Sequence, residues 1–390
     1  MLLSVQLAEF GLFGLTLAGV IVLHRHALAC AVTGLLAIVA TKLVWGTFAT
    51  GPGVLGLVHH LGHETPTLLN LLGLLLGFAV LAKHFELSQA PDVLPRWLPD
   101  SWWGGVVLLA FVFVLSAFLD NIAGAMIGAV IAKEVYSQRV HIGFLAAVVA
   151  ASNAGGAGSV LGDTTTTMLW IAGVPASEVA RAMLGSVVAF AVFAPVAART
   201  QHRFQPMLHD PPPGLVIDLG RLAIVGLVLV GAVATNLWMA MPAVGVWVAL
   251  LAGSLWRKTP WVEVRGALAG ALFLLALVTA ASLMPVDHLP SPVWHTAFGL
   301  GLLSAVFDNI PLTKLALDQG GYDWGFVAYA VGFGGSLLWF GSSAGVAVAN
   351  AFAEAKDTRQ WLRHGWPIAL GYVAGFAAML LGLGWRPGSP

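Results

Sequence analysis

The chain has 390 residues, of which 58% are hydrophobic and only 9% are charged. Soluble domains carry about 25% charged residues, so most of this surface cannot face water, and a soluble globular protein is excluded. Eighteen basic and 18 acidic residues give a net charge of +0 without a basic tract, which excludes nucleic acid as a partner.

The first apolar run covers residues 2–23 and has no Lys or Arg before it, whereas His24, Arg25 and His26 follow it. This charge order is the reverse of that in a cleavable signal peptide. Because positive charge favours the cytoplasm, we expect a retained first helix with its N-terminus outside. The single cysteine, Cys30, excludes intrachain disulfides and a cysteine-based metal cluster.

Further apolar runs have roughly the length that crosses about 30 Å of hydrocarbon as a helix. They cover residues 27–48, 67–85, 102–119, 181–198, 220–256 with room for two passes, 264–284, 293–307 and 366–384. The pattern predicts an all-α, polytopic membrane protein.

Two intervening stretches, 120–175 and 308–353, are apolar but interrupted by Gly, Asn, Ser and Thr. Non-helical backbone survives at membrane depth only where protein or a water-filled cavity satisfies its polar groups. We therefore expect both stretches to line a transport site. A segment rich in proline and charge, 199–218, indicates an extramembrane linker between an N-terminal half, 1–198, and a C-terminal half, 219–390.

Each half contains the same short phrase: residues 116–122 read SAFLDNI and residues 304–310 read SAVFDNI. A second shared element follows in the same order, because 153–164 and 333–343 both hold a Gly-Gly pair and a later Gly in register. Two elements in one order are a stronger signal than either alone. They predict two structural repeats, inverted relative to each other, that meet at the membrane midplane.

The Asp-Asn pairs of the repeated phrase each follow an apolar helix, where a buried carboxylate costs roughly 2.5 to 3.5 kcal/mol. Pro311 removes a backbone donor just after Asp308 and Asn309, which favours a helix that stops and restarts. The alternative is that Asp120 and Asp308 cap the helices that follow them. Capping and ion binding are compatible, and two matched buried pairs favour a functional role.

A glycine-rich turn in the first half leads to Asp163, which four threonines follow. Carboxylate, hydroxyl and free carbonyl oxygens together suit a hard cation such as Na⁺. A helix-packing turn, in which threonines bond back to carbonyls, would explain the hydroxyls but not Asp163. In the second half Ser342 and Ser343 stand in place of Asp163 and Thr164, so the two halves differ chemically.

The three acids Asp120, Asp163 and Asp308 form the predicted Na⁺ site. Buried carboxylates that lie close together can exchange a proton for a cation near neutral pH, which is the minimal chemistry of an antiporter. We expect a secondary transporter and not an enzyme, because no Ser-His-Asp or Cys-His arrangement has the spacing of an active site. No cofactor is expected, since Na⁺ and H⁺ are the cargo.

Two further charged groups lie in or beside apolar runs. Lys314 could neutralise Asp308, or it could pair with Asp318 one helical turn later, and we prefer the second interpretation. Glu86, next to Lys83 at the end of an apolar run, is expected to be an interfacial charge unless it reaches the cavity.

A histidine cluster precedes Pro66. His59, His60 and His63, with Glu64 beside them, include an i,i+4 pair whose spacing can hold Zn²⁺ on a helix. Because glycine and proline flank the segment, we expect an interfacial loop or short helix with solvated histidines instead.

These motifs resemble those of the ion transporter superfamily, and within it most closely those of NhaD-type sodium/proton antiporters. The resemblance rests on residues 116–121, 153–170, 304–311 and 334–346, and it runs from about Glu64 to the C-terminus. Its most specific phrase is Gly-Asp-x-Thr-Thr-Thr-Met-Leu-Trp, which begins at Gly162.

The resemblance implies two repeats with broken helices and re-entrant hairpins, which carry the site across the membrane by an elevator-like or rocking movement. It implies that the transport residues are Ser116, Asp120, Asn121, Asn153, Asp163, Thr165, Thr166, Ser304, Asp308, Asn309, Ser336 and Ser342.

We therefore expect a Na⁺/H⁺ antiporter of the plasma membrane, in contact with lipid and with small inorganic cations; a homodimer is an open alternative. The rival is a cation-coupled carboxylate or other anion transporter of the same superfamily, in which hairpin amides, Ser342 and Ser343 hold the anion. The acids argue against it, because only Lys314 could compensate them. A membrane scaffold without transport conflicts with the duplicated polar stretches.

Overall fold

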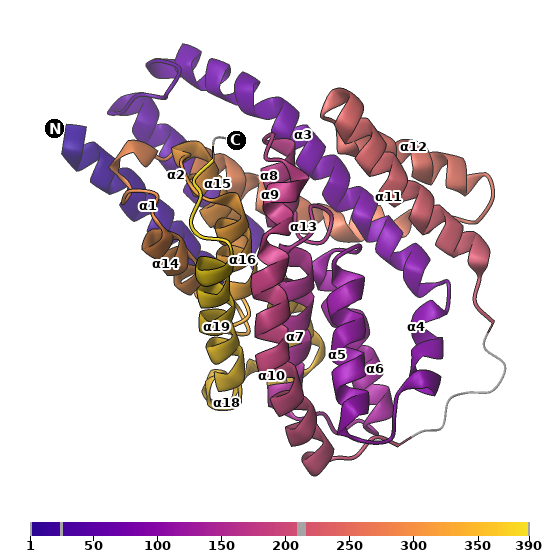
Figure 1. Ribbon diagram of the computed structural model, residues 1–390. Helices are drawn as coiled ribbons and strands as arrows, with labels where there is room; N and C mark the ends of the chain where they lie inside the picture. Colours follow the sequence, from indigo (N-terminus) through magenta and orange to yellow (C-terminus); the bar gives the residue numbers. More distant parts are fainter. Residues whose placement is uncertain (1, 24–25, 209–215, 389–390) are drawn as a thin grey trace.

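The computed structural model describes residues 2–23, 26–208 and 216–388 (Figure 1). Within these ranges the chain is helical and forms no β-strand beyond an isolated bridge between Phe48 and Gly51. The segment expected as a linker, 199–218, overlaps the last turns of a helix that continues to Phe204, and residues 209–215 lie outside the described part.

The helices of the first half are α1 (Leu2–Val22), α2 (Ala27–Val44), α3 (Gly53–Glu86), α4 (Ala90–Val93), α5 (Trp102–Ser116), α6 (Asn121–Val135), α7 (Ile142–Ala157), α8 (Thr164–Ile171), α9 (Ala176–Ala180) and α10 (Ala182–Phe204). Those of the second half are α11 (Leu219–Met239), α12 (Pro242–Ser254), α13 (Val262–Ser282), α14 (Trp294–Ser304), α15 (Asn309–Gln319), α16 (Trp324–Gly334), α17 (Ser343–Ala351), α18 (Thr358–His364) and α19 (Trp366–Gly382).

The expected all-α, polytopic membrane architecture is confirmed. Six helical segments of the described chain are long and apolar enough to cross a membrane, and they cover residues 27–44, 53–86, 176–204, 219–239, 262–282 and 358–382. The run at 220–256 forms the two helices α11 and α12. Large apolar side chains such as Leu255 and Leu381, both 90% exposed, face outward, as a surface in contact with lipid requires.

The helices pack in two groups (Figure 1). In the first, α3 packs against α11, α12 and α13, and α13 also packs against α2, which pairs with α1. In the second, α10 packs against α5, α7, α16 and α19. The small helices α8 and α15 lie at the junction, where Leu71 of α3, Met168, Leu274 and Ile310 share one buried cluster.

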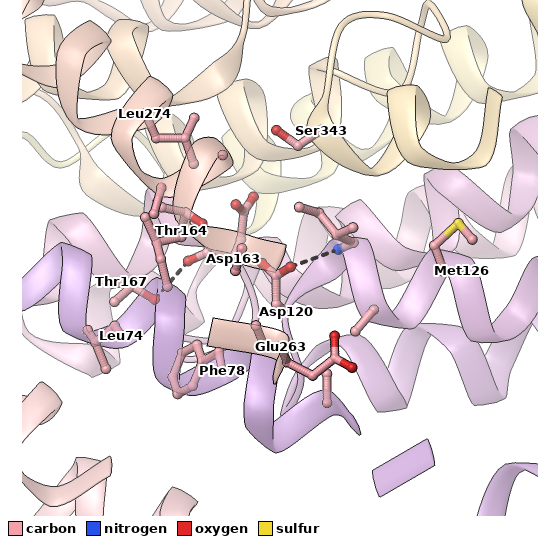
Figure 2. A pocket seen from close by; sticks show the side chains of 18 of the residues that line it. Leu74, Phe78, Asp120, Met126, Asp163, Thr164, Thr167, Glu263, Leu274 and Ser343 are labelled. Atoms are coloured by element: carbon pink, nitrogen blue, oxygen red, sulfur yellow. Dashed lines mark hydrogen bonds between the residues drawn. The ribbon is translucent and has the colours of Figure 1, made fainter. Parts of the chain in front are cut away.

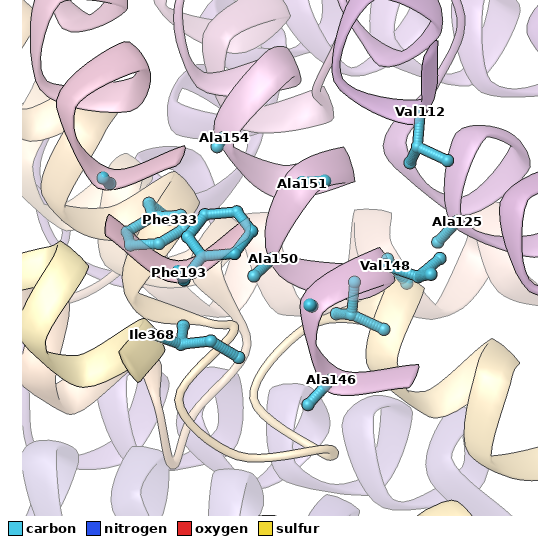
Figure 3. Packing of buried hydrophobic residues seen from close by; sticks show 14 of the residues in the cluster. Val112, Ala125, Ala146, Val148, Ala150, Ala151, Ala154, Phe193, Phe333 and Ile368 are labelled. Atoms are coloured by element: carbon cyan, nitrogen blue, oxygen red, sulfur yellow. The ribbon is translucent and has the colours of Figure 1, made fainter. Parts of the chain in front are cut away.

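The centre of the second group is α7, whose residues Gly143–Ala157 are all buried. This helix consists largely of Ala, Gly and Val, and such small side chains let neighbouring helix backbones approach closely. Figure 3 shows its alanines between Val112 on one side and the aromatic pair Phe193 and Phe333 on the other. Because α16 is equally buried and packs against α7, the polar ends of both helices are held inside protein.

The two halves share an order of elements, α5 to α8 in the first and α14 to α17 in the second. Gly155 lies against the carbonyl of Phe113, and Gly334 lies against the carbonyl of Gly301 in the corresponding place. A Cβ at either glycine would overlap that carbonyl, so close helix contact requires glycine at both positions. The register that the sequence predicts is therefore present, while the inverted orientation of the repeats stays a prediction.

The histidine segment differs from expectation. It belongs to α3, a helix of 34 residues that contains Pro66, and not to a loop or a short helix. His60 is buried, and its Nε2 lies 3.0 Å from the Ser282 hydroxyl, whereas His59 and His63 are exposed. The expectation of solvated histidines is thus wrong for His60, because this face of α3 packs against α13.

Lys314 pairs with Asp318, which is the preferred interpretation of the sequence, and the distance from Nζ to Oδ1 is 2.7 Å. It also binds a partner that the sequence did not indicate, because its Nζ lies 2.9 Å from Oε1 of Glu64 on α3. Lys314 and Glu64 are both more than 90% buried, so this ion pair ties α15 to α3 inside the protein.

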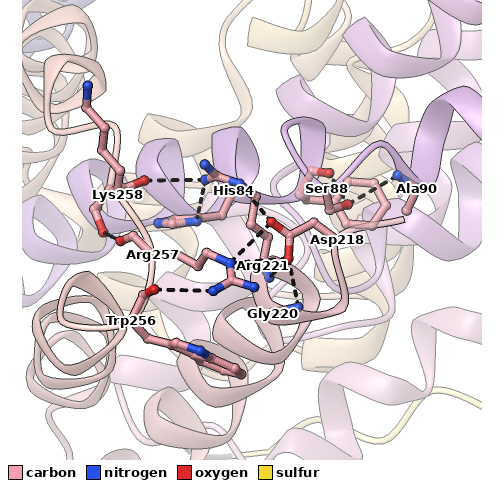
Figure 4. A network of polar contacts seen from close by, with 11 residues as sticks. His84, Ser88, Ala90, Asp218, Gly220, Arg221, Trp256, Arg257 and Lys258 are labelled. Atoms are coloured by element: carbon pink, nitrogen blue, oxygen red, sulfur yellow. Dashed lines mark hydrogen bonds and ion pairs between the residues drawn. The ribbon is translucent and has the colours of Figure 1, made fainter. Parts of the chain in front are cut away.

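A polar network joins the end of α3 to the start of α11 (Figure 4). The Asp218 carboxylate caps α11 by accepting from the backbone N–H groups of Gly220 and Arg221, and it also accepts from Nε of Arg257 at 3.3 Å. Arg221 in turn contacts Nδ1 of His84 at 3.3 Å. Desolvation alone would raise the pKa of Asp218, but the hydrogen bonds from Arg257, Arg221 and Gly220 outweigh it and hold this pKa below its ordinary value.

Candidate functional site

The two Asp-Asn pairs sit at breaks between helices. Helix α5 ends at Ser116 and α6 begins at Asn121, with the Asp120 carboxylate accepting from the N–H of Ile122 at 3.2 Å. In the second half α14 ends at Ser304, and Asp308 accepts from the N–H of Ile310 at 3.0 Å. Both acids are therefore helix caps, which the sequence allowed as the alternative to ion binding.

The glycine-rich turns produce a second matched pair of caps. Asp163 accepts from the N–H of Thr165 at the start of α8, and Ser342 accepts from the N–H of Gly345 at the start of α17. Each turn folds back on the preceding break, since Gly162 lies against the carbonyl of Ser116. This fold-back places Asp163 beside the Asp120 break although 43 residues of sequence separate the two acids in the numbering.

Asn153 connects the two halves. Its Nδ2 donates to the hydroxyls of Ser336 and Ser342, at 2.9 and 3.0 Å, and its Oδ1 accepts from Nδ2 of Asn121 at 3.1 Å. All four side chains are buried. Every polar atom of the Asn153 amide is thus engaged, as a buried polar group requires.

Asp163 also connects the two halves, but as a hydrogen-bond acceptor. It is 2% exposed, and its Oδ2 accepts from Nδ2 of Asn309 at 3.3 Å, so an acid of the first half is bound by the second. The buried hydroxyl of Thr165 lies beside this carboxylate without meeting hydrogen-bond geometry. Asp163 also lies within electrostatic range of both Asp120 and Asp308.

Three of the remaining predicted residues use their hydroxyls in hydrogen bonds, two of them to backbone carbonyls and one to another hydroxyl. Thr166 donates to the carbonyls of Ser159 and Asp163, at 2.6 and 2.9 Å. Ser304 donates to the Val331 carbonyl at 2.7 Å, and Ser116 exchanges a hydrogen bond of 2.9 Å with Ser152. These hydroxyls fix the breaks and turns in place.

Asp308 has a hydroxyl partner instead of an amide. Its Oδ2 accepts from Oγ of Ser343 at 3.2 Å, while its Oδ1 caps α15. Ser343, which stands in place of Thr164 in the second half, therefore donates a hydrogen bond to Asp308, the acid of that half.

A cavity of about 470 Å³ opens beside these groups (Figure 2). Its polar wall contains Asp120, Asp163, Thr164, Thr167 and Ser343, and the rest of its lining near them is mainly Leu, Ile, Phe and Ala side chains from α3, α6 and α13. Asp308 does not line the cavity but contacts it through Ser343. Within the described residues, no three His, Cys, Asp or Glu side chains converge as a metal-binding group.

Sequence reasoning missed several residues around this site. Ser152 donates to the backbone carbonyl of Asn121 at 2.5 Å, and it was hidden in an alanine-rich helix. Glu263 also lines the cavity, although it lies far from both repeat motifs in the sequence. Lys83 and Glu86, which the sequence places at the end of an apolar run, line the cavity as well. Glu86 therefore reaches the cavity and is not simply an interfacial charge. The sequence offered one indication of Lys83 and Glu86 as cavity residues, namely that both are charged and lie at the end of a long apolar run.

Comparisons with known proteins agree with the motifs. Over 420 aligned residues the chain is 29% identical to sodium/proton antiporter 1 of Arabidopsis thaliana, covering 95% of this chain and 71% of that protein. It is 27% identical to the Na⁺/H⁺ antiporter NhaD of Vibrio parahaemolyticus, with 72% of this chain and 82% of that protein covered. For the Na⁺/H⁺ antiporter NhaD of Vibrio cholerae the identity is 29%, with 69% and 68% covered. No family model matches the chain.

Proposed function

Because this multi-pass membrane chain is of the NhaD antiporter type, we propose that it is a secondary transporter that exchanges Na⁺ for H⁺. The membrane in question would be the plasma membrane, with Na⁺ leaving the cell. The protein would act without chemical conversion of a substrate and without a resident cofactor, since both ions are its cargo.

One observation carries this proposal: Asp120 and Asp163, from two separate helix breaks, line the same cavity. The breaks expose carboxylate and hydroxyl oxygens within a largely apolar lining, where a small hard cation gains most from oxygen ligands. A Na⁺ ion bound here would draw on both carboxylates and on the hydroxyls of Thr164 and Ser343. When Na⁺ leaves, protons would neutralise the acids, because uncompensated buried charges are costly.

Asn309, Asn153, Asn121 and the serines would hold this arrangement together. Asn309 fixes Asp163 from the second half, and Asn153 fixes Ser342 from the first. Binding of one ion would therefore affect side chains of both halves. Asp308 would act through Ser343, at the edge of the cavity and not within its lining.

The charges of the cavity disfavour the rival anion transporter. Four carboxylates, Asp120, Asp163, Glu86 and Glu263, line it together with one ammonium group, Lys83. Lys314, the cation that could have compensated an anion site, is held by Glu64 and Asp318 instead.

Reconstitution in liposomes with a trapped pH dye tests the proposal. Additions of Na⁺, Li⁺, K⁺ and dicarboxylates to vesicles with an imposed pH gradient should show proton movement with Na⁺, and none with dicarboxylates. A response to dicarboxylates alone would refute the assignment, and protein-free vesicles supply the background.

A further inference from the structure

Glu263 is a carboxylate of the cavity that the transport chemistry above does not use. It lies in the first turn of α13, and its side chain contributes to the same cavity lining as Asp120 and Asp163. In Figure 2 the side chains of Asp163, Asp120 and Glu263 follow one another away from Ser343. In this view (Figure 2) Glu263 lies beyond Asp120 as seen from Ser343, and all of these residues line the one cavity.

The two glutamates of the lining differ in their surroundings. Glu86 is neutralised locally, because Nζ of Lys83 lies 2.6 Å from its Oε1. Glu263 is half-buried and makes no side-chain hydrogen bond or ion pair with any part of the chain that the structure describes. Its negative charge is therefore free to act on a mobile cation.

A chain with as many basic as acidic residues concentrates negative charge here, because four carboxylates face one ammonium group in the cavity lining. Low-dielectric walls focus the field of such a cleft and raise the local concentration of counter-ions. The apolar side chains of α3 and α13 supply those walls.

A structural alternative exists for Glu263. A carboxylate in the first turn of a helix interacts favourably with the helix dipole, which stabilises the helix by roughly 0.3 to 1 kcal/mol. That role would change the stability of the protein, but it would not make transport depend on ionic strength through this residue.

We propose that Glu263 is a cation-attracting residue in the lining of the transport cavity, which binds Na⁺ loosely before Asp120 and Asp163 receive it. This inference rests on the proposed Na⁺/H⁺ exchange. Glu263 raises the capture rate of a monovalent cation and takes no part in the proton exchange itself. The Lys83–Glu86 pair sets the strength of this attraction, since Lys83 cancels one charge of the lining.

The test measures the apparent KM for Na⁺ in proteoliposomes at ionic strengths of about 0.01 and 0.15 M, adjusted with choline chloride, where the screening length changes from about 30 to 8 Å. At the lower ionic strength Glu263→Gln should raise KM about fivefold with the maximal rate changed less than twofold, and the difference should shrink at the higher ionic strength. Lys83→Gln, which frees Glu86, should lower KM instead.

Glu134→Gln is the matched control. Glu134 is exposed at the C-terminal end of α6, whereas the N-terminal part of this helix lines the cavity. The KM of this variant should equal that of the wild type. An unchanged KM in both Glu263→Gln and Lys83→Gln at low ionic strength would overturn the inference, as would a fall in maximal rate without a change in KM. Wild-type protein that moves no protons with Na⁺ would instead refute the proposed function.

Discussion

Asp163→Asn separates the structural role of this side chain from its chemical role. Asn and Asp are about equally good helix caps, so the amide oxygen can keep the hydrogen bond from the Thr165 N–H. The bond from Asn309 is at risk, because an amide nitrogen would then face the Asn309 Nδ2 group unless one amide rotates. Leaving the buried Asn309 donor without an acceptor costs about 1 to 3 kcal/mol, so the free energy of unfolding should fall by no more than about 3 kcal/mol.

The effect on Na⁺ should be larger. A carboxylate about 4 Å from a bound cation contributes about 4 kcal/mol at an effective dielectric constant of about 20. Removing its charge should therefore weaken Na⁺ binding about a thousandfold. Transport by Asp163→Asn should fall to the background of protein-free vesicles across the accessible Na⁺ range, while thermal unfolding in detergent shows that the protein is still folded.

Asp357→Asn is the appropriate control, because Asp357 also caps a helix but is exposed. Its carboxylate accepts from the N–H of Gln360 at 3.0 Å, so the substitution changes a cap of the same kind outside the cavity. Transport should remain at the wild-type level. If Asp163→Asn exchanged Na⁺ for H⁺ as well as this control does, the assignment of Asp163 to the ion site would be wrong.

Three further predictions concern stability, measured by thermal or denaturant unfolding in detergent. Gly334→Ala should destabilise the protein by about 1 to 3 kcal/mol or more, because the new Cβ overlaps the Gly301 carbonyl, whereas Gly299→Ala has open space and should not. Lys314→Met should cost about 3 to 5 kcal/mol because it leaves Glu64 buried without its partner, and adding Glu64→Leu should recover part of this loss. Asp218→Asn should reduce stability at neutral pH; since the pKa of Asp218 is lowered in the folded state, the difference from wild type is present above the unfolded pKa of about 3.9 and disappears as pH falls through the lower folded pKa.

The apolar runs predicted the long helices outside the two interrupted stretches to within a few residues, except at the start of α3, because long uncharged segments have few alternatives to a membrane helix. The helices within 120–175 and 308–353 matched no run. The breaks at Asp120 and Asp308 were also predictable, since polar residues between apolar runs mark places where the helix cannot simply continue. The failure at α3 has a physical cause. Pro66 normally ends a helix in water because it leaves a backbone carbonyl of the preceding turn without its donor, but in a packed membrane helix neighbouring groups can satisfy that carbonyl, and α3 continues through Pro66 to Glu86.

The acids of the candidate site were found because buried carboxylates are rare in apolar sequence. Their partners were harder to find. Glu64 binds Lys314 across 250 residues of sequence, and no local pattern encodes such a pair. Glu263 was missed for the same reason, because only the packing of α13 against α3 brings it to the cavity.

The chemical difference between the halves has a steric basis at Gly332. In the alignment of the two Gly-Gly motifs this glycine corresponds to Asn153 of the first half. A Cβ at Gly332 would lie 3.4 Å from Oδ2 of Asp163 and 3.2 Å from the Ala157 Cβ, so a longer side chain there would compete with the Asp163 carboxylate for space. The second half thus has no amide at this position; the Asp163 carboxylate of the first half lies beside it and accepts a hydrogen bond from Asn309. A glycine at this position of the second half therefore leaves space for Asp163 within electrostatic range of both Asp120 and Asp308.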